Sequence, residues 1–389
     1  MKKRQLLKTN IFVNLCTFIL LTLLAYTSHG ATADKSFGAW FAYINKTWGD
    51  LPDLTGPSVQ QLDTHPQKKN QEVIIIVVST DGSGNFTTIQ AAIDSIPFRN
   101  KQPVEINIKE GFYREKILIP KTKNHITMIG ITDNDETVIA WNSTASDVIY
   151  GGQKLQTINS ATVAVEADYF IARNITFMNT AQAPRPGAVG GQAVALRISG
   201  DKAAFYGCRF LGHQDTLYDH KGRHFFKNCY IEGTVDFVFG NGRSFYEDVE
   251  LHSDPNYGIP GSITAQKRDE MTIETGFVFV RCKIRGAGMV YLGRAWGNDS
   301  RVVFANTFMD KIVMPKGWDD WHIPACDKTV YYAQFNCTGE GASTMGRVEW
   351  ARELTPEEAA PFITTKFING ESWLEKLPIS STWPSPLIP

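Results

Sequence analysis

The sequence lacks an excess of charge of either sign, and this absence excludes two broad classes of protein. Its 389 residues hold 39 Lys and Arg against 40 Asp and Glu, and 43% of the residues are hydrophobic. Nucleic-acid binding needs a basic excess that neutralises phosphates, and disorder needs low hydrophobicity with a high net charge. The composition therefore predicts a folded protein that binds no nucleic acid and has one large domain or two smaller ones.

Cysteine is also scarce. Cys16 falls in an N-terminal apolar run, and the remaining five are Cys208, Cys229, Cys282, Cys326 and Cys337. So few cysteines exclude a small disulfide scaffold, and their spacings do not match a zinc site. An odd number leaves at least one thiol free or paired between chains. Cys326 and Cys337 are close enough in sequence for a bridge, although spacing alone does not establish one.

Long hydrophobic runs are absent beyond the N-terminus. There, four basic residues precede an apolar run from Ile11 to Tyr26, and small residues follow it. This pattern predicts a secretory signal peptide over residues 1–30. The alternative is a membrane anchor, but a bilayer span needs about 20 apolar residues. We therefore expect a secreted, extracellular protein without membrane association after cleavage.

In a secreted protein, Asn-X-Ser/Thr sequons are candidate acceptors for N-linked glycans. Six are present, at Asn45, Asn85, Asn142, Asn174, Asn298 and Asn336. We expect some of them to carry glycans. Asn174 lies within an apolar strand pattern, where a glycan would be buried.

The chain is expected to begin its folded domain at residue 73 and to continue it to residue 389. Residues 31–72 are polar and irregular, which predicts a linker or surface arm. Val73–Val78 is an apolar β-branched run that predicts a buried strand. Within 87–96, a threonine N-cap and apolar residues on one face predict a short helix that ends at Pro97.

Beyond this helix, short apolar segments recur at near-constant spacing. The segments 205–210, 226–231 and 246–251 end 21 and 20 residues apart, and Gly, Asn and Asp lie between them. Turns without a helical crossover, at a fixed repeat, favour a solenoid of parallel β coils. An antiparallel two-sheet sandwich is the alternative, because it also has short strands at regular turns.

Two carboxylates interrupt these apolar segments. Asp215 and Asp236 are 21 residues apart, about one coil, while Gln192, Gln214 and Asp236 follow one another at intervals of 22. Equivalent positions on successive coils stack about 4.8 Å apart, so the spacing gathers two acids and two amides. One difficulty is that the neighbours Gln214 and Asp215 would face opposite sides of a regular strand. A bend, or a place at a strand end, must bring both to one cleft.

At these residues the sequence resembles the plant pectin methylesterases (pectinesterases) over about residues 73 to 370. The resemblance rests on Gly-Gln-Ala-Val-Ala-Leu at 191–196, Gly-His-Gln-Asp-Thr-Leu-Tyr at 212–218, Gly-Thr-Val-Asp-Phe-Val-Phe-Gly at 233–240 and Leu-Gly-Arg-Ala-Trp at 292–296. It implies an all-β fold, a right-handed parallel β-helix with a short N-terminal capping helix. It also implies a secreted enzyme that demethylates cell-wall homogalacturonan to pectate and methanol, without a cofactor or metal.

The resemblance assigns roles to individual residues. It implies Asp236 as the nucleophile, Asp215 as the general acid/base, Gln192 and Gln214 as oxyanion-stabilising amides, and Thr157, Arg294 and Trp296 as substrate contacts. One departure is Ala295, where the family usually has proline, which puts the stiffness of that loop in doubt.

Further expectations concern the partners and the domain content. Methyl-esterified homogalacturonan is the expected partner of a monomeric enzyme, with proteinaceous pectinesterase inhibitors as further partners. Residues 31–72 are too few for the inhibitor-like pro-domain of many relatives. Two other functions stay open from the residues alone. Paired acids could cleave glycosidic bonds instead, or the protein could bind pectin without catalysis.

Overall fold

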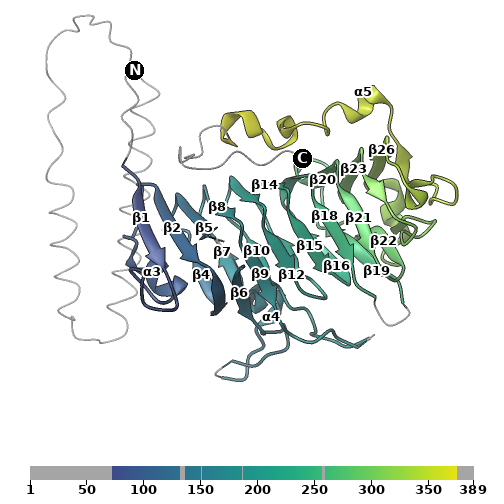
Figure 1. Ribbon diagram of the computed structural model, residues 1–389. Coiled ribbons are helices and arrows are strands. Elements are labelled where there is room, and N and C mark those ends of the chain that lie inside the picture. The colour runs from purple at the N-terminus through teal and green to yellow at the C-terminus, as the bar shows by residue number, and fades with distance from the viewer. Residues whose placement is uncertain (1–71, 132–135, 150, 186, 256–258, 375–389) are drawn as a thin grey trace, which may run out of the picture. The chain divides into compact units, whose positions relative to one another are not determined.

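The computed structural model describes residues 72–131, 136–149, 151–185, 187–255 and 259–374 (Figure 1). The predicted signal peptide and most of the predicted arm lie outside the described residues. None of the described helices is long and apolar enough to cross a membrane.

The described strands form three parallel sheets, of 11, 8 and 8 strands. The first sheet contains β1 (Ile74–Val78), β2 (Val104–Lys109), β5 (Ile126–Ile131), β8 (Ile171–Arg173), β11 (Ala203–Tyr206), β14 (Arg223–Lys227), β17 (Arg243–Glu247), β20 (Gly276–Val280), β23 (Arg301–Ala305), β26 (Tyr331–Phe335) and β27 (Arg352–Glu353). The second contains β4 (Ile117–Ile119), β7 (Val163–Val165), β10 (Leu196–Ile198), β13 (Leu217–Asp219), β16 (Val235–Gly240), β19 (Gly261–Gln266), β22 (Val290–Ala295) and β25 (Trp318–Asp319). The third contains β3 (Gly111–Arg114), β6 (Thr137–Trp141), β9 (Thr176–Asn179), β12 (Arg209–Leu211), β15 (Tyr230–Gly233), β18 (Glu250–Ser253), β21 (Lys283–Gly286) and β24 (Phe308–Met309).

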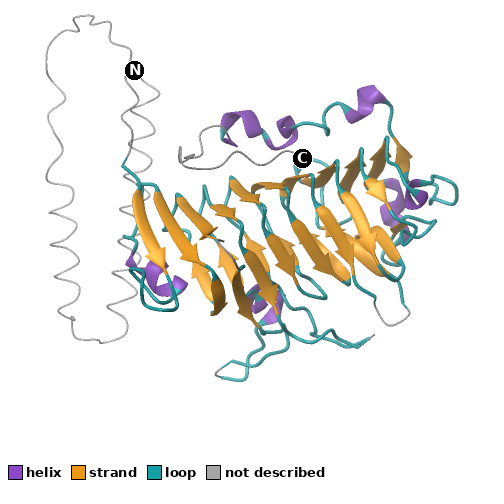
Figure 2. Ribbon diagram, viewed as in Figure 1, coloured by secondary structure: helices purple, strands orange, loops and turns teal. Residues whose placement is uncertain are grey.

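Successive strands visit the first, third and second sheets in turn, and each strand pairs with its counterpart one coil later (Figure 2). The fold is therefore a right-handed parallel β-helix, as the spacing and the resemblance predicted. The antiparallel sandwich is excluded, because all the described pairings between named strands are parallel. Short helices occur between and after the strands: α3 (Ile89–Ser95), α4 (Gln156–Ser160), α5 (Pro356–Ala359) and the 3₁₀ turns η1 (Pro324–Lys328), η2 (Glu340–Ala342), η3 (Thr365–Ile368) and η4 (Gly370–Ser372).

An aromatic column fills the core and fixes the register of the coils. Phe205, Phe226, Tyr246, Phe279 and Phe304 stack in that order with ring centroids 4.8, 4.5, 4.5 and 4.6 Å apart. These distances match the separation of neighbouring strands, so each of these five coils, from β11 to β23, adds one ring to a continuous stack. This is the physical basis of the repeat visible in the sequence.

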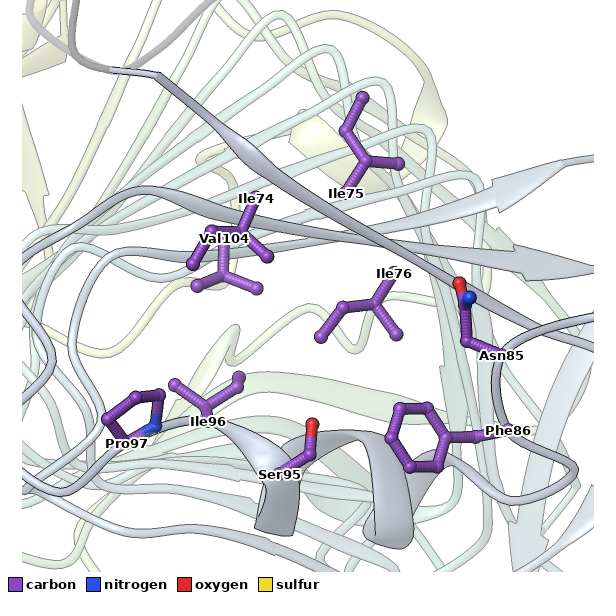
Figure 3. Close-up of a pocket in the computed structure, with 9 residues that line it drawn as sticks. All are labelled: Ile74, Ile75, Ile76, Asn85, Phe86, Ser95, Ile96, Pro97 and Val104. Carbon is purple, nitrogen blue, oxygen red and sulfur yellow. The ribbon is translucent and has the colours of Figure 1, made fainter.

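The predicted helix is α3, which closes the N-terminal end of the core. Thr88 is its N-cap and accepts a hydrogen bond from the Ala91 N–H, while Ile89, Ala92 and Ile93 are buried. Between α3 and β1 lies a hollow of about 400 Å³, lined by apolar side chains and by Asn85 and Ser95 (Figure 3). Because none of its lining residues is titratable, this hollow is not a candidate for acid–base chemistry.

A column of left-handed residues turns the chain from the first sheet into the third. It comprises Asn174, Gly207, Asn228, Asp248, Arg281, Asn306 and Asn336, with φ between 48° and 60°. Glycine and asparagine tolerate this conformation best, which explains their recurrence between the apolar segments. At this corner Asn174 is exposed, so the expectation that a glycan there would be buried was wrong.

The five described cysteines are all free thiols, four of them buried. The bridge considered between Cys326 and Cys337 is not formed. The Cys326 Sγ lies 3.7 Å from the Asn298 side-chain oxygen, whereas the Cys337 Sγ lies 3.4 Å from the Phe304 carbonyl. The two thiols therefore have separate surroundings.

The segment after β27 packs along the outside of the first sheet (yellow in Figure 1). Phe367 and Trp373 join a second apolar cluster with Phe225, Phe245 and Val278. This segment covers the outer face of the first sheet, and it leaves the outer face of the second sheet for the site described next.

Candidate active site

The register of the second sheet places the two predicted acids on adjacent coils. β13 pairs with β16 so that Leu217 lies opposite Val238, an offset of 21 residues that also relates Asp215 to Asp236. The Asp215 N–H donates to the Val235 carbonyl at 3.0 Å, which extends the pairing to the acids themselves. The one-coil spacing read from the sequence is thus present in the structure.

Local backbone irregularities turn both acids away from the regular pleat. Asp215 has φ 66° and Asp236 has φ 50°, both in the left-handed region. In addition, the register of β16 against β19 shifts between Val235 and Val238, which is a bulge around Asp236. Bulges redirect side chains, and left-handed residues end the alternation of faces. This is the bend that the neighbouring positions of Gln214 and Asp215 required.

Arg294 holds the Asp236 carboxylate in a two-pronged ion pair. Its Nε donates to Oδ1 at 3.0 Å and its Nη2 donates to Oδ2 at 2.5 Å. The guanidinium carbon lies 4.0 Å from the centre of the Trp321 ring, so the ring stacks on the cation. Such a planar, two-bond contact fixes both the charge and the orientation of the carboxylate.

Burial and charge separate the protonation behaviour of the two acids. Asp215 and Asp236 are only 8% and 5% exposed. Burial raises the pKa of Asp215 well above its ordinary value, and the negative charge of Asp236 raises it further. Burial also raises the pKa of Asp236, but Arg294 opposes this by its charge and hydrogen bonds. The arrangement favours one proton on Asp215 and a negative charge on Asp236.

Gln214 lies on the same coil as Asp215, and Gln192 lies on the coil before it. The Ala193 N–H donates to the Gln214 backbone carbonyl at 3.1 Å, which ties the Gln192 coil to the Gln214 coil. Both glutamine side chains are partly exposed. Within the described residues, neither side-chain amide is engaged in a hydrogen bond, so their N–H groups are available to a ligand.

Thr157 lies in α4 and is connected to the same coils. Its backbone carbonyl accepts a hydrogen bond from the Ser160 hydroxyl, which in turn accepts from the Val194 N–H at 3.2 Å. These two hydrogen bonds tie α4 to Val194, which lies two residues after Gln192.

Aromatic side chains line the outer face of the second sheet next to the acids. Tyr218 and Phe239 stack at 4.3 Å, and Trp296 lies 6.0 Å from Phe239. Ala295, between Arg294 and Trp296, is the buried last residue of β22. Phe239 is buried, at 3% exposed, and supports the Tyr218 and Trp296 rings that pack against it. This supporting role was missed from sequence, although the spacing of 21 between Phe239 and Tyr218 was a usable signal.

Several aromatic residues that follow Trp296 in the sequence lie away from the acids. Trp318 and Tyr332 are 1% and 0% exposed and stack on each other inside the core. Tyr331 packs against Phe362 of the C-terminal segment. Trp321, by contrast, stacks on the Arg294 guanidinium that holds Asp236.

A pectinesterase family model matches residues 75–371 of the chain. Pectinesterase QRT1 of Arabidopsis thaliana is 48% identical over 301 residues, which cover 77% of this chain and 78% of that protein. The chain belongs to the pectinesterase family. Pectinesterases are carboxylic ester hydrolases that remove methyl esters from pectin, so the chain is an enzyme of that class.

Solved structures of the family have the same fold. The pectin methylesterase from carrot superposes with a TM-score of 0.71 at 38% identity, covering 78% of this chain and 97% of that one. A pectin methylesterase solved in complex with a hexasaccharide gives a TM-score of 0.65 at 28% identity, covering 76% and 96%. The family membership therefore rests on both sequence and architecture.

Proposed function

We propose that this pectinesterase removes methyl esters from homogalacturonan with Asp236 as the nucleophile and Asp215 as the general acid/base. The observation that carries the proposal is the pairing of an Arg294-bound, charge-stabilised carboxylate with a neighbouring buried acid that favours its proton. A hydrolysis in which one carboxyl group attacks the ester and another protonates the leaving methoxide needs one carboxyl group in each of these states.

In the first half of the reaction, the Asp236 carboxylate attacks the ester carbonyl carbon and forms a tetrahedral oxyanion. The N–H groups of Gln192 and Gln214 donate to this oxyanion. In another hydrolase the loss of one such donor lowers turnover by about 10²–10³-fold. When the intermediate collapses, the C–O bond to the methoxy group breaks, and that oxygen takes the proton of Asp215. Methanol leaves, and an acyl-enzyme at Asp236 remains.

In the second half, the now ionised Asp215 takes a proton from water. The resulting hydroxide attacks the acyl carbon, and the bond to Asp236 breaks. The products are a galacturonic acid group, which releases its proton to solvent and becomes galacturonate, a free Asp236 carboxylate and a protonated Asp215, so the cycle closes without an added reagent.

The neighbouring side chains supply substrate contacts in this proposal. Thr157, Arg294 and Trp296 contact the polymer, and Tyr218, stacked on the buried Phe239, extends the aromatic surface on which sugar rings pack. The partner is methyl-esterified homogalacturonan, and the enzyme acts as a secreted monomer in the cell wall, where proteinaceous pectinesterase inhibitors bind it. The amino-terminal pattern at residues 1–30 and the family's substrate support this location.

Activity should depend on pH through both acids. It falls at low pH because protonated Asp236 is not a nucleophile, and it falls at high pH because ionised Asp215 has no proton for methoxide. Replacing Arg294 by Gln removes the charge that opposes the rise in the Asp236 pKa. An adjacent opposite charge is worth about 1–3 pKa units, so we expect the acid limb of kcat/KM to move upward by about that amount. Initial rates of methanol release across pH measure it, and an unmoved acid limb would contradict the assignment of Arg294.

Product analysis of the wild-type enzyme separates esterase action from glycosidase action or simple binding. We expect methanol to be released from methylated pectin while the number of reducing ends stays constant. New reducing ends would indicate cleavage of glycosidic bonds, and retention of pectin without methanol would indicate a binding protein. Demethylated pectate is the matched control substrate, because it offers the same glycosidic bonds and no ester.

A further inference from the structure

One cluster of described residues outside the active site presents ligand atoms of the kinds that bind metal ions. Glu232 in β15, His252 in β18 and Asp254 just after β18 each offer one, and these atoms all lie within 4.8 Å of one another. Ligand atoms around an ion bound at about 2.1 Å lie roughly 3–3.5 Å apart. Small side-chain rotations would bring the three ligand atoms to this separation. We propose that Glu232, His252 and Asp254 bind a divalent ion of the zinc or manganese type.

The strand pairing holds the three ligands on one face. Glu232 lies directly opposite His252 in the pairing of β15 with β18. Asp254 is two residues beyond His252, and its N–H donates to the Gly233 carbonyl at 2.9 Å. Positions two residues apart along an extended chain share a face. The separation of the ligands is therefore set by the sheet, as a preorganised metal site requires.

Tyr230 adds the outer support that metal-binding carboxylates commonly have. Its hydroxyl donates to the Glu232 Oε2 at 2.7 Å, and its ring lies 5.7 Å from the His252 ring. The bond fixes one carboxylate oxygen of Glu232 and leaves the other for a metal ion. Outer partners of this kind orient the ligand, and their loss typically weakens metal affinity by about 10–100-fold.

The local charges also favour a cation. The ligand oxygens of Glu232 and Asp254 lie within 4.8 Å of each other, so the negative charges of the two carboxylates repel. A bound cation would relieve this repulsion between the carboxylates. The Nδ1 of the neighbouring His213 is enclosed and has no hydrogen-bond partner within the described residues. Arg285 lies opposite His252 on the next strand and is exposed, so its charge limits the affinity.

The ligand types select among metal ions. One imidazole and two carboxylates suit Zn²⁺ and Mn²⁺, whereas Ca²⁺ takes six to eight oxygen ligands. The three residues have no role in the proposed ester hydrolysis. Failure of the metal proposal would therefore leave the esterase proposal intact, and methanol release by the same preparations reports on the latter separately.

Calorimetric titration of the chelator-treated, untagged enzyme with zinc chloride tests the site. We expect a single Zn²⁺ per chain, with affinity reduced by at least about 100-fold in His252→Gln and in Asp254→Asn, and by about 10-fold in Tyr230→Phe. His322→Gln is the matched control, since His322 is exposed and outside the cluster. Unchanged methanol release by each variant checks that it is folded.

Three outcomes would overturn the proposal. The first is no zinc binding by the wild-type enzyme up to about 1 mM, an affinity too weak to matter. The second is binding that survives His252→Gln and Asp254→Asn undiminished. The third is a preference for calcium chloride over zinc chloride and manganese chloride, because this ligand set does not suit calcium.

Discussion

Replacing Asp236 by Asn is expected to reduce methanol release by about 10⁴-fold or more, the scale on which loss of a catalytic-triad residue acts in another hydrolase. The amide has nearly the shape of the carboxylate but cannot attack an ester carbonyl. Asparagine also tolerates the left-handed conformation, with φ 50°, that Asp236 adopts. The fold and the affinity for pectin should therefore persist. Methanol release under saturating pectin, together with pectin binding by the inactive variant, measures both.

The control is the same substitution at Asp248. That residue also has a left-handed backbone, with φ 55°, but it lies at the opposite corner of the coil and pairs with Arg281. Asp248→Asn should keep wild-type turnover. Near-normal turnover in Asp236→Asn would remove Asp236 from the nucleophile's role, whereas equal losses in both variants would point to damage to the fold.

Replacing Asp219 by Ala is expected to cost about 3–5 kcal/mol of unfolding free energy, the usual cost of breaking a buried pair. Asp219 and His224 are both fully buried, with the Asp219 Oδ1 and the His224 Nδ1 2.5 Å apart. The His224 Nε2 faces the Gly200 carbonyl at 2.9 Å, and the Tyr246 hydroxyl donates to the other Asp219 oxygen. Alanine would leave the Tyr246 hydroxyl without its partner and His224 Nδ1 with only the Ser244 hydroxyl, at 3.4 Å. Equilibrium unfolding in urea measures the loss.

Two variants make this result interpretable. Asp219→Asn should recover much of the stability, because an amide can donate to a neutral His224 and accept from Tyr246. Asp269→Ala breaks an exposed pair with Lys267 at 2.8 Å. Such exposed pairs contribute only about 0–1 kcal/mol, so this variant should remain near wild type. An Asp219→Ala protein as stable as Asp269→Ala would show that the buried pair does not stabilise the β-helix.

Much of the architecture was predictable because each coil of a β-helix is specified by residues that are close together in the sequence. The repeated Asn, Asp and Gly residues mark left-handed corners, and the apolar segments between them mark strands. The interval between Asp215 and Asp236 is one coil, so their adjacency followed from the spacing. The location of Trp318 in the core did not follow, because an exposed and a buried tryptophan look alike in sequence.

The face of the sheet toward which the Asp215 and Asp236 side chains point was not predictable from the spacing of the two residues. A regular strand would send Gln214 and Asp215 to opposite faces, and only the left-handed backbone at Asp215 and the bulge at Asp236 remove that conflict. A one-residue change of register reverses every side chain in a strand. The bulge involves the pairing of β16 with β19, whose register no local pattern in the sequence displays.

By itself, the sequence determined the parallel coil, the capping helix and the family, because turn residues, apolar spacing and contiguous motifs are local features of the chain. Only the tertiary structure decided that Arg294 clamps Asp236 across 58 residues of sequence, that Trp321 covers the guanidinium, and that Glu232 meets His252 and Asp254. The physical reason is that these contacts depend on side-chain direction and on register between coils. Both are set by packing between segments that are distant in the chain.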